Sequence, residues 1–278
     1  MNIQVDRLQI EVKNLKDVQN VFDSRGISIQ KVGVNDVHLP FIIKGKNGKC
    51  QNVLTKIKFT VDLSKEYKGT HMSRFIELLS EWNQQPIYSD TMEELLNDAL
   101  DKLSANSVFL QMDFKYFIEK MAPVSLKRSV LDLDCSFIAQ KSIGNPIDFI
   151  LGINVPFTSL CPCSKEISKY GAHNQRGLMR VKIKYDATDK IFWIEDLVKA
   201  LEQQSCSPVY PLLKREDEKF VTETAYENPK FVEDVLRDLV IALRKFDCIT
   251  WFDIECENYE SIHNHNAYAN HTEFVNKG

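Results

Sequence analysis

Apolar and polar residues alternate along several stretches of this chain. The clearest case is 52–63, where Val53, Ile57, Phe59 and Val61 fall on one side and lysine and threonine side chains on the other. A period of two predicts a strand with one buried face. The same pattern, or short apolar runs bounded by polar turns, predicts further strands over 27–43, 108–117, 129–139, 149–157, 178–185, 249–256 and 268–274.

Other stretches repeat their apolar residues every three or four positions, which predicts helices. The first is 71–83, and Pro86 is expected to end it. Thr91 and Glu94 have the spacing of a capping box at the start of a second helix. Two more helices are expected over 194–204 and 229–246. For the last of these, Asn228 is expected as the N-cap and Pro229 as the first helical residue.

The predicted elements occur twice in the same order: strand, strand, helix, helix, strand, strand. The two halves share this order but no sequence identity. Two such units side by side predict an α+β chain with antiparallel sheets and helices on one face. We expect an N-terminal arm over 1–26, a first module over 27–145 and a second module over 146–278.

Composition places the chain among ordinary globular proteins. It has 278 residues, of which 44% are hydrophobic and 27% charged, and a formal net charge of -4. This charge gives no reason to expect nucleic-acid binding. No apolar run reaches the length of a membrane span, and the first residues lack the pattern of a signal peptide, so we expect a cytoplasmic protein.

Seven cysteines are present, and without a secretion signal they are expected to be thiols or ligands rather than a disulfide framework. Cys161 and Cys163 flank Pro162, and His173 follows. Thiolate and imidazole at this separation can meet on one divalent ion such as zinc. Two half-buried cysteines and a loop histidine would give the same pattern. Cysteines 135, 248 and 256 lie in apolar, strand-like stretches and are expected in the core.

The region around Cys161 also resembles a known signature. The runs 159–168 (Ser-Leu-Cys-Pro-Cys-Ser-Lys-Glu-Ile-Ser) and 171–177 (Gly-Ala-His-Asn-Gln-Arg-Gly) resemble that of the type IB GTP cyclohydrolases. These are metal-dependent enzymes that open folate and related pterin biosynthesis in many bacteria. Three further blocks match in the same order, so that the resemblance covers nearly the full length: 68–75, 208–219 and 257–268.

The resemblance implies a fold, an assembly and a reaction. The fold would be the tunnelling fold (T-fold), with two tandem ββααββ modules per chain, assembled as a homotetramer around barrels. Pairing of open sheet edges across subunits gives a physical reason for such an assembly. The reaction would convert GTP and water to 7,8-dihydroneopterin triphosphate and formate. A water activated by zinc, manganese or iron(II) would attack carbon 8 of the guanine.

The resemblance also assigns metal ligands. Cys161 and His173 are the first two, and Cys161 is favoured over Cys163. Within the mixed-charge run 214–219, which by itself is typical of an exposed loop, the family favours Glu218 as the third ligand and Glu216 next. In an extended segment these two side chains would point the same way.

The family's functional residues match further positions in this sequence. Glu233 resembles the helical glutamate that anchors a purine or pterin through two adjacent hydrogen bonds, although an exposed helical glutamate is the ordinary case. His263 and His265 lie two residues apart in a polar segment between strands, where metal ligation, acid–base catalysis and an ordinary loop role are all open. Because three ligands are assigned elsewhere, we expect them to act with Cys161 in catalysis, by acid–base chemistry, or to contact phosphate.

A basic block at the start of the first predicted helix completes the set. Lys68, His71 and Arg74 are expected to bind the triphosphate of GTP, because a helix N-terminus with basic neighbours favours anions. Three other cations are weaker candidates: Lys65, Lys165 and Arg176. Two rival functions are a nitrile reductase with a nucleophilic cysteine on the same fold and a non-catalytic module stabilised by zinc.

Overall fold

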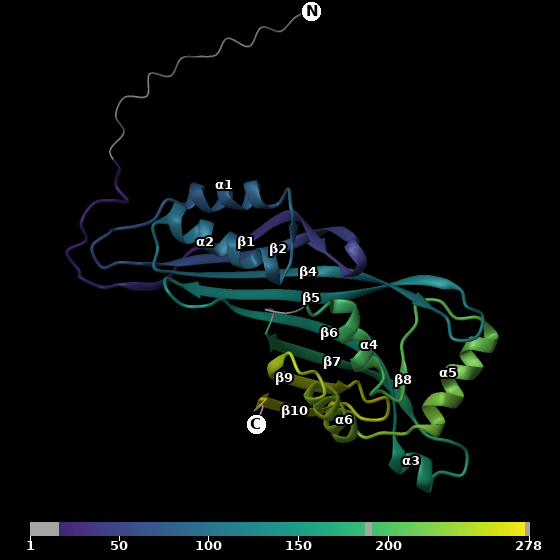
Figure 1. Cartoon of the computed structure of the whole chain (residues 1–278). Coiled ribbons are helices and arrows are strands. Elements are labelled where there is room, and N and C mark those ends of the chain that lie inside the picture. Colours follow the sequence, from purple (N-terminus) through teal and green to yellow (C-terminus); the bar gives the residue numbers. More distant parts are fainter. Residues whose placement is uncertain (1–16, 187–190, 276–278) are drawn as a thin grey trace, which may run out of the picture.

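A computed structural model of the protein describes residues 17–186 and 191–275. One large sheet runs through the molecule, with helices on one of its sides (Figure 1). Its strands follow the order β10-β9-β7-β6-β5-β4-β2-β1-β3, and β8 pairs with β6. Except for the short parallel pair β1–β3, all pairs are antiparallel. The predicted α+β class and antiparallel sheet are confirmed.

All eight predicted strands are observed with bounds that differ by a few residues, and the two-residue strands β3 and β8 are additional. They are β1 (Ile29–Lys44), β2 (Cys50–Leu63), β3 (Pro86–Ile87), β4 (Ser107–Met121), β5 (Arg128–Ser142), β6 (Asp148–Leu160), β7 (Asn174–Tyr185), β8 (Ser207–Pro208), β9 (Ile249–Asn258) and β10 (Ala267–Phe274). In β2 the predicted inward set is buried, together with Thr55, whose hydroxyl donates to the carbonyl of Leu39 at 2.7 Å. Since β5 pairs with β6 along 134–140 and 148–154, both halves share one sheet.

Four helices cover the sheet and bury its apolar side: α1 (Met72–Trp82), α2 (Ser89–Leu103), α4 (Ile194–Glu202) and α6 (Val232–Arg244). Short α3 (Pro162–Ile167) and longer α5 (Arg215–Glu227) lie toward one end of the sheet. Between β1 and β2 a single 3-10 turn, η1 (Lys46–Gly48), takes the predicted turn position.

Two helix starts differ from the prediction. The second helix begins at Ser89, because the hydroxyl of Thr91 accepts the backbone N–H of Tyr88 at 2.9 Å and closes the first turn earlier. The last begins at Val232, not at Pro229. Asn228 instead ends α5, and the N–H of Lys230 donates to the carbonyl of Leu160 at 3.3 Å, which draws the backbone away from a helical path.

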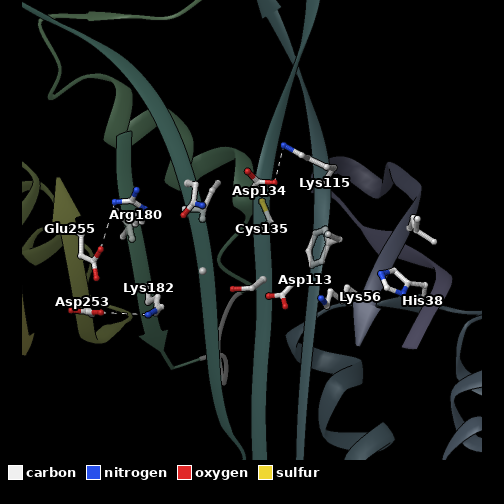
Figure 2. A pocket seen from close by; sticks show the side chains of 17 residues that line it. His38, Lys56, Asp113, Lys115, Asp134, Cys135, Arg180, Lys182, Asp253 and Glu255 are labelled. Carbon is white, nitrogen blue, oxygen red and sulfur yellow. Dashed lines mark ion pairs between the residues drawn. The ribbon is translucent and has the colours of Figure 1, made fainter. Parts of the chain in front are cut away.

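The opposite side of the sheet carries a shallow pocket of about 490 Å³ (Figure 2). Charged side chains from neighbouring strands line it and pair with each other: Lys115 with Asp134, Arg180 with Glu255 and Lys182 with Asp253. None of the functional residues predicted from the sequence is among its lining residues. The positive and negative side chains on this surface therefore neutralise each other, and the predicted functional residues lie in other parts of the molecule.

The predicted N-terminal arm lies mostly outside the described residues, since the structure describes the chain from residue 17. Within the described part, Phe22 forms an isolated bridge with Tyr67. None of the seven cysteines, all of which lie within the described residues, forms a disulfide; Cys135 and Cys256 are buried, as predicted, and Cys248 is half-buried. Among residues 17–186 and 191–275, the helices lack the length and apolar character needed to cross a membrane.

Candidate functional site

The structure brings Cys161 and His173 together. β6 ends at Leu160 and β7 begins at Asn174, and these two residues form the last pair of the ladder. One step further, the N–H of Cys161 donates to the carbonyl of His173 at 3.2 Å. The ladder ends here because Pro162 has no N–H to donate and begins the helix α3. A thiol and an imidazole thus project from adjacent backbone positions.

Ser164 fixes this arrangement, and the sequence did not point to it. Its hydroxyl donates to the carbonyl of Cys161 at 3.2 Å and accepts the N–H of His173 at 3.2 Å. Its own N–H donates to the sulfur of Cys161 at 3.4 Å. One side chain therefore bonds to both predicted ligand residues and holds their backbones in place.

The imidazole of His173 is held from one side. Its Nδ1 lies 2.9 Å from Oε1 of Gln175 and 3.9 Å from Oε2 of Glu260. Gln175 is buried, and the side chains of His173 and Glu260 are only 14% and 12% exposed. Gln175 and Glu260, which are both largely buried, therefore set the orientation of the imidazole ring.

Close packing around Gly177 explains why the signature has a glycine at this position. A Cβ at this position would lie 2.4 Å from the ring of Phe157 and 2.8 Å from Oδ1 of Asn258. The aromatic ring can cover the strand here only because no side chain is present. Any larger residue would push Phe157 away from the sheet end that carries Cys161 and His173.

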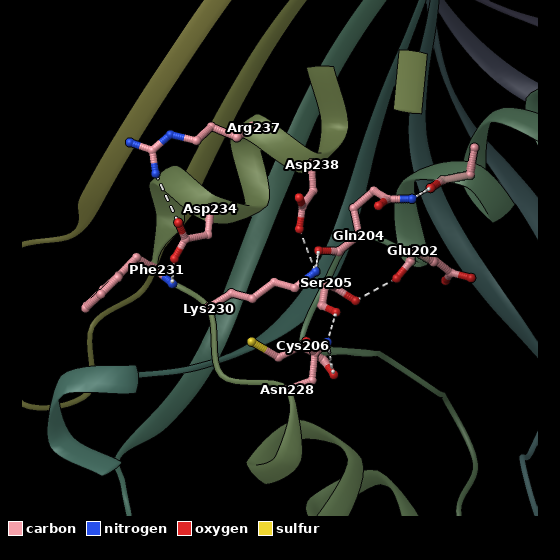
Figure 3. A network of polar contacts seen from close by, with 11 residues as sticks. Glu202, Gln204, Ser205, Cys206, Asn228, Lys230, Phe231, Asp234, Arg237 and Asp238 are labelled. Atoms are coloured by element: carbon pink, nitrogen blue, oxygen red, sulfur yellow. Dashed lines mark hydrogen bonds and ion pairs between the residues drawn. The ribbon is translucent and has the colours of Figure 1, made fainter. Parts of the chain in front are cut away.

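Polar contacts hold the segment that leads into α6 (Figure 3), and the N–H of Lys230 in this segment donates to the carbonyl of Leu160. The ammonium of Lys230 donates to the carbonyl of Gln204 at 2.9 Å and to Asp238 at 2.8 Å. The amide of Asn228 donates to the carbonyl of Ser205 at 3.0 Å. These contacts place exposed Glu233, in the first turn of α6, at the same end of the sheet as Cys161.

A small apolar cluster lies beneath this end of the sheet. Leu160, Cys206 and Ala225 are buried together, with Ala172 packed against them. Burial raises the pKa of the Cys206 thiol, although nearby hydrogen bonds and Lys230 oppose the shift. Cys206 thus remains a neutral thiol with a packing role.

The run 214–219 is a helix start and not an extended loop. Asp217 is buried and accepts the N–H groups of Lys214, Val124 and Ser125, each at 2.8 Å. Burial alone would raise the pKa of this carboxyl, but the hydrogen bonds from Ser125, Lys214 and Val124 outweigh it and hold the pKa well below its usual range.

This helical start corrects the expected orientation of Glu216 and Glu218. Two residues apart on a helix, they point about 200° away from each other and not the same way. Both are exposed. The two glutamates therefore cannot substitute for each other without a rotation of the helix.

The opposite end of α5 contacts the signature loop. The ammonium of Lys165 donates to the carbonyl of Tyr226 and lies 4.4 Å from the centre of its ring. Glu218 lies two turns away, near the start of α5. In the part of the chain that the structure describes, no three His, Cys, Asp or Glu side chains gather closely enough to hold a metal ion. Cys161 and His173 are thus brought together, and Glu218 is not beside them.

The loop that carries His263 and His265 joins β9 to β10 at the same end of the sheet. The N–H of Tyr259 donates to the carbonyl of Arg176 at 2.9 Å, and Ser261 lies 3.5 Å from Oε1 of Gln175. Both histidines are exposed, and their rings stack with centres 5.1 Å apart. This loop therefore lies next to the Cys161–His173 pair.

The basic block lies at the other end of the sheet. β2 ends at Leu63, and His71 follows at the N-cap of α1, with Nε2 3.3 Å from Asp17. Antiparallel pairing places the end of β2 opposite to the end of β6. A strand of the length of β6 spans roughly 40 Å. Within one chain, Lys68, His71 and Arg74 therefore do not reach the Cys161–His173 pair.

Comparison with solved structures shows the fold. The chain is similar to a highly active mutant of the urate oxidase of Bacillus sp. TB-90, with a TM-score of 0.52 and 10% identity over 88% of this chain and 100% of that one. It is also similar to a uricase from Bacillus fastidious, with a TM-score of 0.54 and 8% identity over 88% of this chain and 93% of that one. At such low identity the likeness concerns the architecture alone.

Sequence comparison is far more specific. A protein from Citrifermentans bemidjiense named GTP cyclohydrolase FolE2 is 51% identical over 92% of this chain and 94% of its own length. A protein of the same name from Geotalea uraniireducens is 52% identical over 92% of both chains. The family model described as type I GTP cyclohydrolase folE2 matches residues 15–269. The chain therefore belongs to the type I GTP cyclohydrolase FolE2 family.

Proposed function

We propose that this protein is a GTP cyclohydrolase, which converts GTP and water to 7,8-dihydroneopterin triphosphate and formate as the first step of folate and pterin biosynthesis. Its family membership covers residues 15–269. The observation that carries the proposal is the convergence, at one end of the sheet, of Cys161, His173, the His263–His265 loop and the first turn of α6.

The donor atoms at this end fit a divalent ion. Cys161 supplies a thiolate, and His173 supplies an imidazole whose Nδ1 faces Gln175, so that Nε2 is the nitrogen on the open side of the ring. Sulfur and nitrogen donors suit zinc and also accept manganese or iron(II). We assign Glu218 as the third ligand, which requires α5 to move or a second chain to contribute it. When bound, such an ion lowers the pKa of a water so that it becomes a nucleophile at neutral pH.

The remaining residues act on the substrate. Glu233 accepts two adjacent hydrogen bonds from the guanine edge and so fixes the base. His263 and His265 exchange protons with the ring nitrogen and the leaving groups, the usual role of imidazole in general acid–base catalysis. Cys161, as a metal ligand, holds the metal site in place relative to Glu233 and the two histidines.

The basic block implies that one chain does not form a complete site. Lys68, His71 and Arg74 lie roughly 40 Å from Cys161 within a chain, and a nucleoside triphosphate is much shorter. We assign their triphosphate-binding role to a second copy, placed so that its α1 approaches the Cys161 end. A homotetramer of tandem T-fold modules, 27–145 and 146–278, accounts for this geometry, since β10 is an edge strand that a second copy can pair.

The test is formate release from GTP by metal-stripped protein, with zinc, manganese and iron(II) added back separately. The proposal requires formate and, after oxidation, a fluorescent pterin with at least one metal. Glu218→Ala should abolish both, whereas Glu216→Ala, on the other face of α5, should leave them. Absence of formate with every metal, from folded protein, would contradict the cyclohydrolase activity. Equal effects of the two variants would contradict only the ligand assignment.

A further inference from the structure

Three side chains form a continuous polar chain behind the candidate metal site. Nδ1 of His173 lies 2.9 Å from Oε1 of Gln175, and Nε2 of Gln175 donates to Oε1 of Glu260 at 3.3 Å. All three side chains are largely enclosed. Buried polar groups of this kind keep fixed partners, because an unpaired one is costly.

The chemistry of the last group fixes the direction of the chain. An ionised carboxylate only accepts hydrogen bonds, so the NH₂ of Gln175 must face Glu260. The amide oxygen of Gln175 must then face the imidazole, and the hydroxyl of Ser261 lies 3.5 Å from that same oxygen and donates to it as well. An oxygen with no proton can only accept, so Nδ1 of His173 must carry the hydrogen.

This order of donors determines which nitrogen of His173 is free. With the proton on Nδ1, the lone pair of the neutral ring is on Nε2, which points away from Gln175. We propose that Gln175 and Glu260 are positioning residues that set the tautomer of His173 and thereby present Nε2 to the divalent ion. The inference rests on the proposed metal-dependent function. It assigns to Gln175 and Glu260 a role that acts only through His173.

Zinc affinity, measured by competition with a chromophoric chelator, tests this assignment without any measurement of turnover. Glu260→Gln removes the acceptor-only group, so that either end of the Gln175 amide can face the ring. Gln175→Leu keeps a similar volume and removes the acceptor itself. Each should weaken zinc binding by about 10- to 100-fold, as is usual for partners of ligating histidines. Glu166→Gln, an exposed carboxylate on α3, is the matched control and should bind zinc like the unaltered protein.

A double-mutant cycle separates positioning from direct ligation. In a His173→Ala background, Glu260→Gln should change zinc affinity by less than about twofold, because no ring is left to orient. If Glu260→Gln still weakens zinc binding to the full extent in that background, Glu260 binds the metal itself. The proposed positioning of His173 by Glu260 through Gln175 (the relay) is then wrong. Unchanged affinity in Glu260→Gln would also overturn it.

Failure of the relay and failure of the proposed function give different results. If the relay alone is wrong, the unaltered protein still binds zinc in a manner that requires Cys161, and still releases formate. If the unaltered protein binds no divalent metal, the metal centre and the relay are both overturned. Thermal unfolding of each variant checks its fold, and should Gln175→Leu fail to fold, the Glu260→Gln cycle decides.

Discussion

Each half of the chain has two long strands, helices that cover the sheet and two further strands, but the second half has the additional helices α3 and α5 in its connections. In the first half, β1 ends at Lys44 and β2 begins at Cys50, with only the η1 turn between. In the second half, the corresponding strands β6 and β7 are joined by the loop from Cys161 to His173, which contains α3. Both connections emerge at the same end of their strands.

The helix-to-helix connections differ in the same sense. α1 and α2 are joined through the two-residue strand β3, whereas α4 and α6 are joined through β8 and the whole of α5. The longer connections of the second half carry Cys161, His173 and Glu218, which we propose as metal ligands, whereas the matching connections of the first half are short. In the proposed function, the shared sheet thus supplies a rigid frame, and the long connections at one end of it carry the proposed ligands.

The difference between the two matching connections can be tested by substituting a cysteine on each of them. Cys161→Ala removes a thiolate ligand, so formate release should fall to background and bound zinc should be lost. Cys50→Ala, at the turn between β1 and β2, should change neither, since Cys50 is exposed at the start of β2. Formate assays and metal analysis of both proteins provide the measurement. A fully active Cys161→Ala protein that retains zinc would remove the distinction between the two connections.

The second prediction concerns Arg74, which the first half of another copy would supply to the site that contains Cys161. Arg74→Ala and Cys161→Ala should each be inactive alone. After the two are unfolded together and refolded, about a quarter of the sites should combine an intact Arg74 with an intact Cys161, and formate release should recover to about that fraction. No recovery from a mixed oligomer would place Arg74 outside the site.

Histidines in the two halves give the third prediction. His263→Ala removes a proton donor beside Cys161, and formate release should fall about 10²- to 10⁴-fold with little change in bound zinc. His38→Ala, at an exposed position of β1 in the first half, should leave the rate unchanged. A loss of zinc together with activity in His263→Ala would indicate metal ligation and not proton transfer.

Glycines of the two halves differ in what surrounds them. Gly177→Ala would place a methyl group against the ring of Phe157, and such overpacking costs about 1–3 kcal/mol of unfolding free energy. A Cβ in Gly69→Ala would make only ordinary contacts with Gln19, the nearest atom at 3.6 Å, so the stability should change by less than about 0.5 kcal/mol. Denaturant unfolding of both variants measures the difference. Equal stabilities would mean that Phe157 can move freely.

The smallest effect concerns the ion pair that ties α6 to β10. Hydrogen bonds from Arg244, and then from His271, lower the pKa of Glu273 from 4.5 to about 2. A depressed carboxyl pKa contributes stability above pH 4.5 and loses it as the pH falls toward 2. Glu273→Gln should therefore lower the thermal midpoint slightly at pH 7, and the difference should close between pH 4.5 and pH 2. A constant difference across that range would exclude the charge as its cause.

Much of the frame was predictable because burial on one side of a strand leaves a visible period. The alternation over 52–63 predicted β2, and the sheet buries those residues as expected. α5 left no such trace, because Asp217 and Ala225 are its only buried residues, so it has no apolar stripe. Its first turn depends on contacts of Asp217 with Val124 and Ser125, which lie far away in sequence.

The site was predictable only in part for a related reason. The signature placed Cys161 and His173 in one loop, and the structure joins them. Ser164, Gln175 and Glu260 lay within or beside the matched motifs, but their contacts depend on strand register and loop path, which sequence order does not reveal. The position of His71 at the far end of the sheet likewise follows from strand pairing and not from any local pattern.

The direct hydrogen bond between the backbones of Cys161 and His173 has a consequence for metal exchange. Ser164 and the β6–β7 ladder hold both residues in place through protein contacts alone. Unlike small domains whose folding depends on their metal, this chain has a large core that is independent of the site. If the proposed metal occupies this site, a chelator should therefore remove it from a protein that stays folded, and the metal supply of the cell would decide which ion returns.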